Sequence, residues 1–149
     1  MGVPYDSFAG AFLAKITEFE LTALTSSAQQ ETVDGYMKRA ISAFKKICKY
    51  DLTTTANDTE RVFDVEINAD ALDEIIDIVS EGMVVQWLKP YVYKQELLEN
   101  VLNTRDFTSY SPAELLLRVG NAYKQAQKDY TQMIREYSFN NGNLADLHL

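Results

Sequence analysis

The chain has 149 residues, of which 14 are Lys or Arg and 22 are Asp or Glu, giving a net charge of −8 at pH 7. This length is typical of one domain, and a composition that is 46% hydrophobic is too apolar for a disordered chain. The acidic balance argues against a protein whose whole surface binds nucleic acid, because such binding neutralises phosphates with basic side chains. We therefore expect one domain over residues 1–149.

The single cysteine, Cys48, cannot close an intrachain disulfide, which is typical of a protein from a reducing cytoplasm. Cys48 lies on an apolar helical face and the only histidine is His148, so no paired nucleophile is predicted. Residues 1–10 lack the basic start and apolar core of a signal peptide, and no window has the apolar length of a membrane span. We expect a protein made in the cytoplasm, without membrane contact.

The first half of the chain predicts two helices. Phe8, Phe12 and Ile16 form one apolar stripe, which predicts a helix from Pro4 to about Lys15 or Ile16. Residues 17–27 have no helical period and are interpreted as a connector. Apolar positions then recur at helical spacing over residues 29–49, which predicts a second helix. The opposite face of that helix carries only basic charges, at Lys38, Arg39, Lys45, Lys46 and Lys49.

Residues 51–68 begin as a polar loop and end in strict alternation, with Phe63, Val65 and Ile67 apolar. One interpretation is an extended strand or arm, whose free edge pairs with another subunit unless residues 18–24 supply a partner. The alternative is a loop whose apolar residues dock on the core.

The second half predicts three more helices. Residues 70–90 read as the most buried helix, ended by Pro90, and a shorter helix is expected over 94–102. A capping box with proline at the first helical position, at residues 111–114, starts the last helix, which we expect to run from 112 to 137. Residues 138–149 are rich in asparagine and are expected to form an extended tail. The fold class predicted is therefore mainly α, a bundle of about four to five helices.

The last helix has a heptad seam that includes Tyr123, Tyr130 and Tyr137. Such a seam packs either inside one chain or against a neighbouring subunit, where the tyrosine hydroxyls remain available to a partner. Both alternatives are open from the sequence.

The residues required by most catalytic sites are missing. With one His, one Cys and six Gly, the chain has no zinc constellation, no Ser-His-Asp set and no phosphate-binding glycine loop. The acidic residues at 70, 73, 74, 77 and 81 lack a calcium-binding loop, and a solvated helix face explains them. We predict no enzymatic activity, no cofactor and no metal site.

Three segments, VPYDSFAGAFLAKI at 3–16, GMVVQWLKP at 82–90 and REYSFNNGNLADL at 135–147, resemble small structural proteins of tailed bacteriophages. They are similar to the head-tail connector, or adaptor, proteins. The resemblance implies a mainly helical subunit that forms a ring of twelve copies beneath the portal, in the neck of the virion. It also implies binding to the portal through a C-terminal segment, contact with a stopper or tail-completion protein, and a channel that passes genomic DNA without binding it specifically.

Within that frame the sequence suggests which residues make contact. Residues 51–81 hold ten acids and one base, whereas the rest of the chain is nearly neutral, so the charge forms a block. We expect basic and acidic flanks to meet between subunits, with the seam tyrosines adding to the contact. The expected subunit-interface residues are Lys38, Arg39, Lys45, Lys46, Asp64, Glu66, Asp73, Asp77, Tyr123 and Tyr130. The expected portal-binding residues of the tail are Phe139, Asn140, Asn141, Leu144 and Leu147.

Two other functions remain open from the sequence. The basic face of the second helix is also typical of a packaging or regulatory protein that binds nucleic acid, with an affinity that falls as salt rises. The tyrosine seam is also typical of a cytoplasmic helical regulator or chaperone that binds one protein partner.

Overall fold

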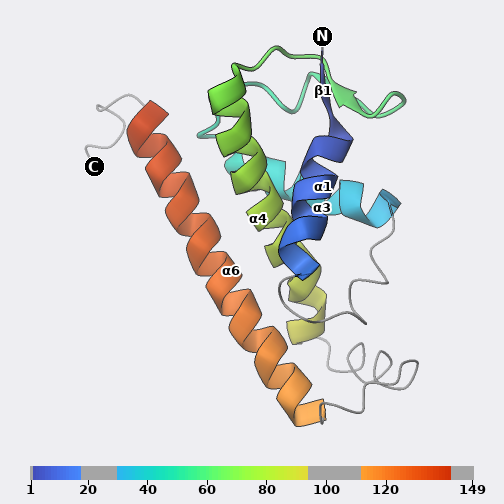
Figure 1. Ribbon diagram of the computed structural model, residues 1–149, viewed down its shortest axis with the longest axis vertical. Helices are drawn as coiled ribbons and strands as arrows, with labels where there is room; N and C mark the ends of the chain where they lie inside the picture. The colour runs from blue at the N-terminus through green and yellow to red at the C-terminus, as the bar shows by residue number, and fades with distance from the viewer. Residues whose placement is uncertain (1, 18–29, 94–111, 142–149) are drawn as a thin grey trace.

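Helix α4 (Ala69–Tyr93) is the element against which the other helices pack in the computed structural model, which describes residues 2–17, 30–93 and 112–141 (Figure 1). Its sequence is apolar around most of its circumference from residue 75 to residue 88, so it is surrounded by other elements. The buried side chains of α4 include Ile75, Val79, Met83, Trp87 and Leu88.

Helix α1 (Tyr5–Thr17) packs on α4 through the stripe that the sequence predicts. Phe8, Phe12 and Ile16 are fully buried, and the ring of Phe12 meets Trp87 edge-on at 6.1 Å between centroids. Such an edge-to-face contact adds to the stabilisation from burial.

Helix α3 (Gln30–Phe44) is shorter than expected. Val33, Met37 and Phe44 are buried on its apolar face. The helix ends where the Ile47 N–H donates a hydrogen bond to the carbonyl of Phe44, three residues back, as in a 3₁₀ turn. The N–H of Lys49 then donates to the hydroxyl of Tyr137 at 2.9 Å. The prediction of a helix to residue 49 is therefore wrong, and Lys45, Lys46 and Lys49 follow the helix rather than lie on it.

The alternating segment contains the centre of a small antiparallel sheet in the order β1-β3-β2. Strand β3 (Val62–Phe63) pairs with β2 (Ala56–Asn57) and with β1 (Val3–Pro4). The prediction of a free edge on this segment is therefore wrong at β3, whose two neighbours come from its own hairpin and from residues 3–4. Beyond Phe63, residues 64–68 are irregular with Val65 and Ile67 half-buried, which matches the alternative of a loop docked on the core.

Two helix ends differ from the sequence predictions. Pro90 does not stop α4, which continues to Tyr93. A proline so close to a helix end removes one late hydrogen bond, and Val92 still packs against the core. Helix α6 (Pro112–Asn141) begins where the capping box predicts but runs past residue 137. Extending an existing, packed helix by one turn costs little compared with nucleating one, so the asparagines at 140 and 141 do not end it earlier.

The mainly α bundle with a long C-terminal helix is thus confirmed. In Figure 1, α6 runs along one edge of the molecule and packs on α4, α1 lies on the other side of α4, and α3 crosses behind α4. The connector expected over residues 17–27 lies outside the described residues, except that Thr17 belongs to α1. The helix expected at 94–102 and the tail beyond 141 also lie outside them.

Candidate interaction surfaces

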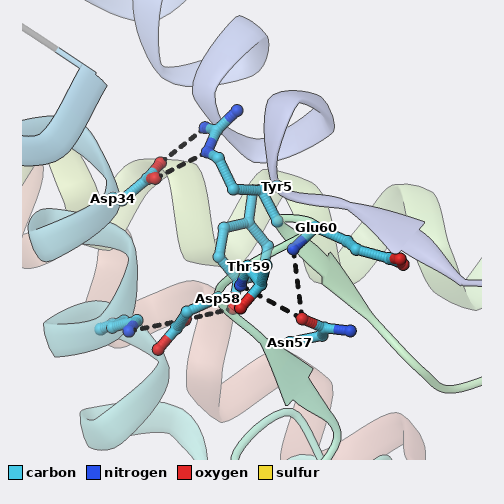
Figure 2. Close-up of polar contacts among 8 residues, drawn as sticks. Tyr5, Asp34, Asn57, Asp58, Thr59 and Glu60 are labelled. Carbon is cyan, nitrogen blue, oxygen red and sulfur yellow. Dashed lines mark hydrogen bonds and ion pairs between the residues drawn. The ribbon is translucent and has the colours of Figure 1, made fainter.

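An ion-pair cluster, which we call the Arg61 clamp, fastens the β2–β3 hairpin to two helices, and Figure 2 shows its contact with Asp34. The guanidinium of Arg61 donates to both carboxylate oxygens of Asp34 on α3 at 2.8 Å, and to Asp6 on α1 at 2.7 Å. Arg61 has a φ of 56°, a left-handed conformation that is uncommon for a residue with a Cβ. The paired carboxylates hold the side chain across this turn.

A second polar group lies beside the clamp. The hydroxyl of Tyr5 donates to Asp58 at 2.6 Å, and the ammonium of Lys38 pairs with the same carboxylate at 2.7 Å. The hydrogen bonds from Lys38 and Tyr5 hold the pKa of Asp58 below its usual range, while burial raises the pKa of Tyr5 well above its own. Asp58 therefore stays ionised and Tyr5 stays protonated at neutral pH. Asn57 accepts the N–H groups of Thr59 and Glu60 at 3.1 Å, which closes the turn.

The basic interface residues predicted on the second helix lie next to acids of their own chain. Lys38 is paired with Asp58, and Lys45 lines a hollow of about 260 Å³ whose rim includes that carboxylate and whose floor is apolar. Lys46 lines a neighbouring hollow together with Asp51. Arg39, Lys45 and Lys46 are exposed and form no ion pair among the described residues. This basic surface is thus partly neutralised from within the chain.

The acidic interface residues divide into two groups. Asp77 forms an ion pair with Lys15 of α1 at 2.7 Å, and Glu81 contacts the same ammonium at 3.4 Å. Asp64, Glu66 and Asp73 are exposed, without an ion pair in the part of the chain that the structure describes. Within the same residues, no group of three or more His, Cys, Asp or Glu side chains is arranged to hold a metal ion.

The seam tyrosines pack inside the chain. Tyr123 is 7% exposed, and its hydroxyl accepts a hydrogen bond from the Gln127 amide at 2.9 Å. The hydroxyl of Tyr130 donates to the Ala40 carbonyl on α3 at 2.8 Å, and the buried ring of Tyr137 meets Phe44 edge-on. Of the two alternatives for the seam, the geometry favours packing within one chain, which leaves Tyr123 and Tyr130 little surface for a neighbour.

The segment expected to form the portal-binding tail is helical at its start. Phe139, Asn140 and Asn141 belong to the last turn of α6, so the boundary expected at residue 138 is wrong. Phe139 is 66% exposed. Leu144 and Leu147 lie outside the described residues.

One surface that the sequence analysis missed is the outer face of α6. Lys124, Lys128 and Arg135 are exposed there and line an open groove of about 740 Å³, which reaches Val85 on α4. The signal was present in the sequence, because these residues lie on the side of the helix opposite the heptad seam.

Cys48 is half-buried, and burial raises the pKa of its thiol, which disfavours the reactive thiolate. None of the described helices combines the length and the apolar character needed to cross a membrane.

Comparisons of the chain with protein-family models, curated proteins and solved structures gave no match.

Proposed function

We propose that the chain is a structural protein of a phage virion, a head-tail connector. It assembles as a ring of twelve copies beneath the portal, links the capsid to the tail and extends the DNA channel. The observation that carries this proposal is the resemblance of three segments, 3–16, 82–90 and 135–147, to connector proteins. These segments occur in the same order and span nearly the whole chain.

The positions of those segments in the fold support the proposal. Segment 3–16 supplies Phe8 and Phe12 to the core, segment 82–90 supplies Trp87, and the helical part of the last segment supplies Tyr137. All four rings are buried, and Phe12 contacts Trp87 directly. The resemblance therefore includes residues that form the helical core.

The surface of the subunit also suits a ring. Exposed acids occur at the hairpin and at the start of α4, and exposed bases occur after α3 and along α6. A closed ring needs two different, complementary flanks on each subunit, and opposite charges provide such complementarity.

Portal binding is assigned to the C-terminal segment. Leu144 and Leu147 are the apolar anchors proposed for this segment, while Phe139 lies on α6 and is exposed. A short polar segment with spaced leucines gains buried apolar area when it orders in a groove of a partner.

The test combines particle composition with a portal-binding assay. We expect the protein to be present in purified virions and to bind the portal protein of the same phage. Replacing residues 142–149 by a Gly/Ser segment of equal length should abolish portal binding while circular dichroism retains the helical signal. The change leaves α6 intact, so a loss of binding reports on the segment and not on folding.

Asp146→Asn in the otherwise unmodified chain is the matched control for a loss caused by altered charge, because Asp146 is the only side chain of residues 142–149 that is charged at pH 7. Absence of the protein from virions contradicts the connector function. Portal binding that survives the Gly/Ser replacement contradicts only the role of the C-terminal segment.

A further inference from the structure

The face of α6 that points away from α4 carries three bases, Lys124, Lys128 and Arg135, which we call the basic stripe. They are four and seven residues apart, so they lie in one line along the helix. All three are exposed, and none forms an ion pair within residues 2–17, 30–93 and 112–141. This stripe is therefore a band of uncompensated positive charge.

The acids of α6 lie to one side of the stripe. The amide of Gln125 donates to Asp129 at 2.9 Å, and the amide of Gln132 donates to Glu136 at 3.1 Å. These hydrogen bonds hold both carboxylates on the flank of the helix. The basic stripe is consequently not neutralised from within its own helix.

Exposed apolar side chains extend the stripe at both ends. Leu117 lies seven residues before Lys124 and is 64% exposed, and Phe139 lies four residues after Arg135 and is 66% exposed. Together the face spans about 33 Å at 1.5 Å per residue. Each of these apolar side chains lies at an end of the stripe and could be buried when this face meets another protein surface.

A complementary surface lies elsewhere on the same chain. Four exposed acids, which we call the acidic edge, run from the end of the sheet into the first turn of α4 and form no ion pair among the described residues: Asp64, Glu66, Asp70 and Asp73. Next to this edge is a hollow of about 490 Å³. Its lining includes the apolar side chains Val65, Ile67 and Leu72.

The two surfaces match in length as well as in charge. The basic stripe from Lys124 to Arg135 covers about 16 Å of helix. The acidic edge, with extended chain up to residue 68 followed by helix, covers at most about 21 Å. Because the stripe faces away from α4, it does not face the acidic edge at the start of α4 in its own chain.

We propose that the basic stripe of one copy binds the acidic edge of a second copy, with Leu117 or Phe139 buried in the apolar hollow beside it. The contact joins two different surfaces and is therefore head-to-tail, an arrangement that closes into a ring or continues as a filament. This inference adds a subunit contact to the proposed connector function. It rests on that function in one respect, that copies of the chain associate. It assigns the contact to α6 rather than to the bases that follow α3.

The decisive experiment is an exchange of charge between the two surfaces. One variant carries Lys124→Glu, Lys128→Glu and Arg135→Glu, and another carries Asp64→Lys, Glu66→Lys and Asp73→Lys. In sedimentation velocity at low salt, each variant alone should associate at least about tenfold more weakly than the unmodified chain, because like charges then face each other. A mixture of the two variants should associate again, since each restores the complement of the other.

The matched control is Arg39→Glu combined with Lys45→Glu and Lys46→Glu, which makes the same change in net charge on the other basic surface. We expect it to leave association nearly unchanged. Failure of the mixture to recover association, or a loss caused only by the control, overturns the proposal. Circular dichroism of each variant confirms that it is folded.

Cross-linking keeps the test decisive if association of the unmodified chain is weak. A carbodiimide joins amines to carboxylates in contact, and a mixture of ¹⁴N- and ¹⁵N-labelled chains identifies links between copies. We expect mixed-isotope peptides that join Lys124 or Lys128 to residues 64–73. Their absence at the highest attainable protein concentration overturns the proposal.

Two further measurements separate this inference from its alternatives. Salt-dependent binding of double-stranded DNA that is abolished by the α6 variant, without mixed-isotope links, assigns the stripe to nucleic acid instead. If the protein is absent from virions but the mixture of the two variants still recovers association, the connector function is contradicted and the contact between the basic stripe and the acidic edge is retained. If the protein binds the portal but the mixture does not recover association, the connector function is retained and this contact is contradicted.

Discussion

Gly82 on α4 lies between Ala40 of α3 and Tyr130 of α6. A Cβ at this position would be 2.7 Å from Cε1 of Tyr130 and 2.8 Å from the Cβ of Ala40. The Tyr130 ring cannot move away freely, because its hydroxyl is bonded to the Ala40 carbonyl. The glycine therefore sets the distance between three helices, and its absence of a side chain is a packing requirement.

We expect Gly82→Ala to lower the free energy of unfolding by about 1–3 kcal/mol through overpacking, measured by urea denaturation. The matched control is Gly120→Ala on α6, where an added Cβ meets no atom within 4 Å. That change should be neutral or should stabilise by up to about 1 kcal/mol, since alanine favours a helix more than glycine does. Equal effects of the two substitutions would contradict the close contact.

The β2–β3 hairpin is held by side chains rather than by a large sheet. Each of its strands has two residues, so the ladder contributes few hydrogen bonds, and the Arg61 clamp joins the hairpin to α1 and α3. Arg61 and Asp34 are only 22% and 20% exposed at their side chains, whereas Lys38 and Asp58 are 50% and 64% exposed. The clamp should therefore stabilise the element more than the neighbouring pair does.

Substitution Arg61→Ala should lower the free energy of unfolding by about 1–2 kcal/mol, because it leaves the partly buried Asp34 without its charged partner. The control Lys38→Ala removes an exposed ion pair and should have little measurable effect. Urea denaturation and hydrogen exchange at the hairpin amides give the two comparisons. A larger effect at Lys38 than at Arg61 would show that the clamp does not hold the hairpin.

At the scale of the whole molecule, tyrosine side chains connect the helices, and their ionisation limits the stability of the fold at high pH. Burial raises the pKa of Tyr130 and of Tyr137 to about 12, and that of Tyr5 above its usual range. The unfolded chain releases these protons near pH 10, while the folded chain retains them. Their contribution to stability is thus complete below pH 10 and is lost as the pH rises through about 12.

The free energy of unfolding should accordingly decrease between pH 10 and pH 12, as measured by urea denaturation at fixed pH values. Tyr130→Phe removes one of the groups responsible, so its stability should decrease less steeply over the same range. An identical slope for the variant and the unmodified chain would contradict burial of the Tyr130 hydroxyl.

The sequence by itself determined the helical elements, because their signals are local. The stripe of Phe8, Phe12 and Ile16, the capping box before Pro112 and the heptad seam of α6 each lie within a few turns of one helix. The ends predicted at residues 49, 90 and 137 were wrong. The helices end at Phe44, Tyr93 and Asn141, because a helix end depends on what the last turn packs against.

Only the tertiary structure decided how the charges and the strands are paired. Lys15 pairs with Asp77, Arg61 with Asp34, and β3 with residues 3–4, and each pair is distant in the sequence. The net charge of −8 does not show which bases are neutralised within the chain and which remain exposed. That distinction depends on which surfaces the folded helices bring together, and it left the bases on the outer face of α6, like Arg39, Lys45 and Lys46, without ion-pair partners among the described residues.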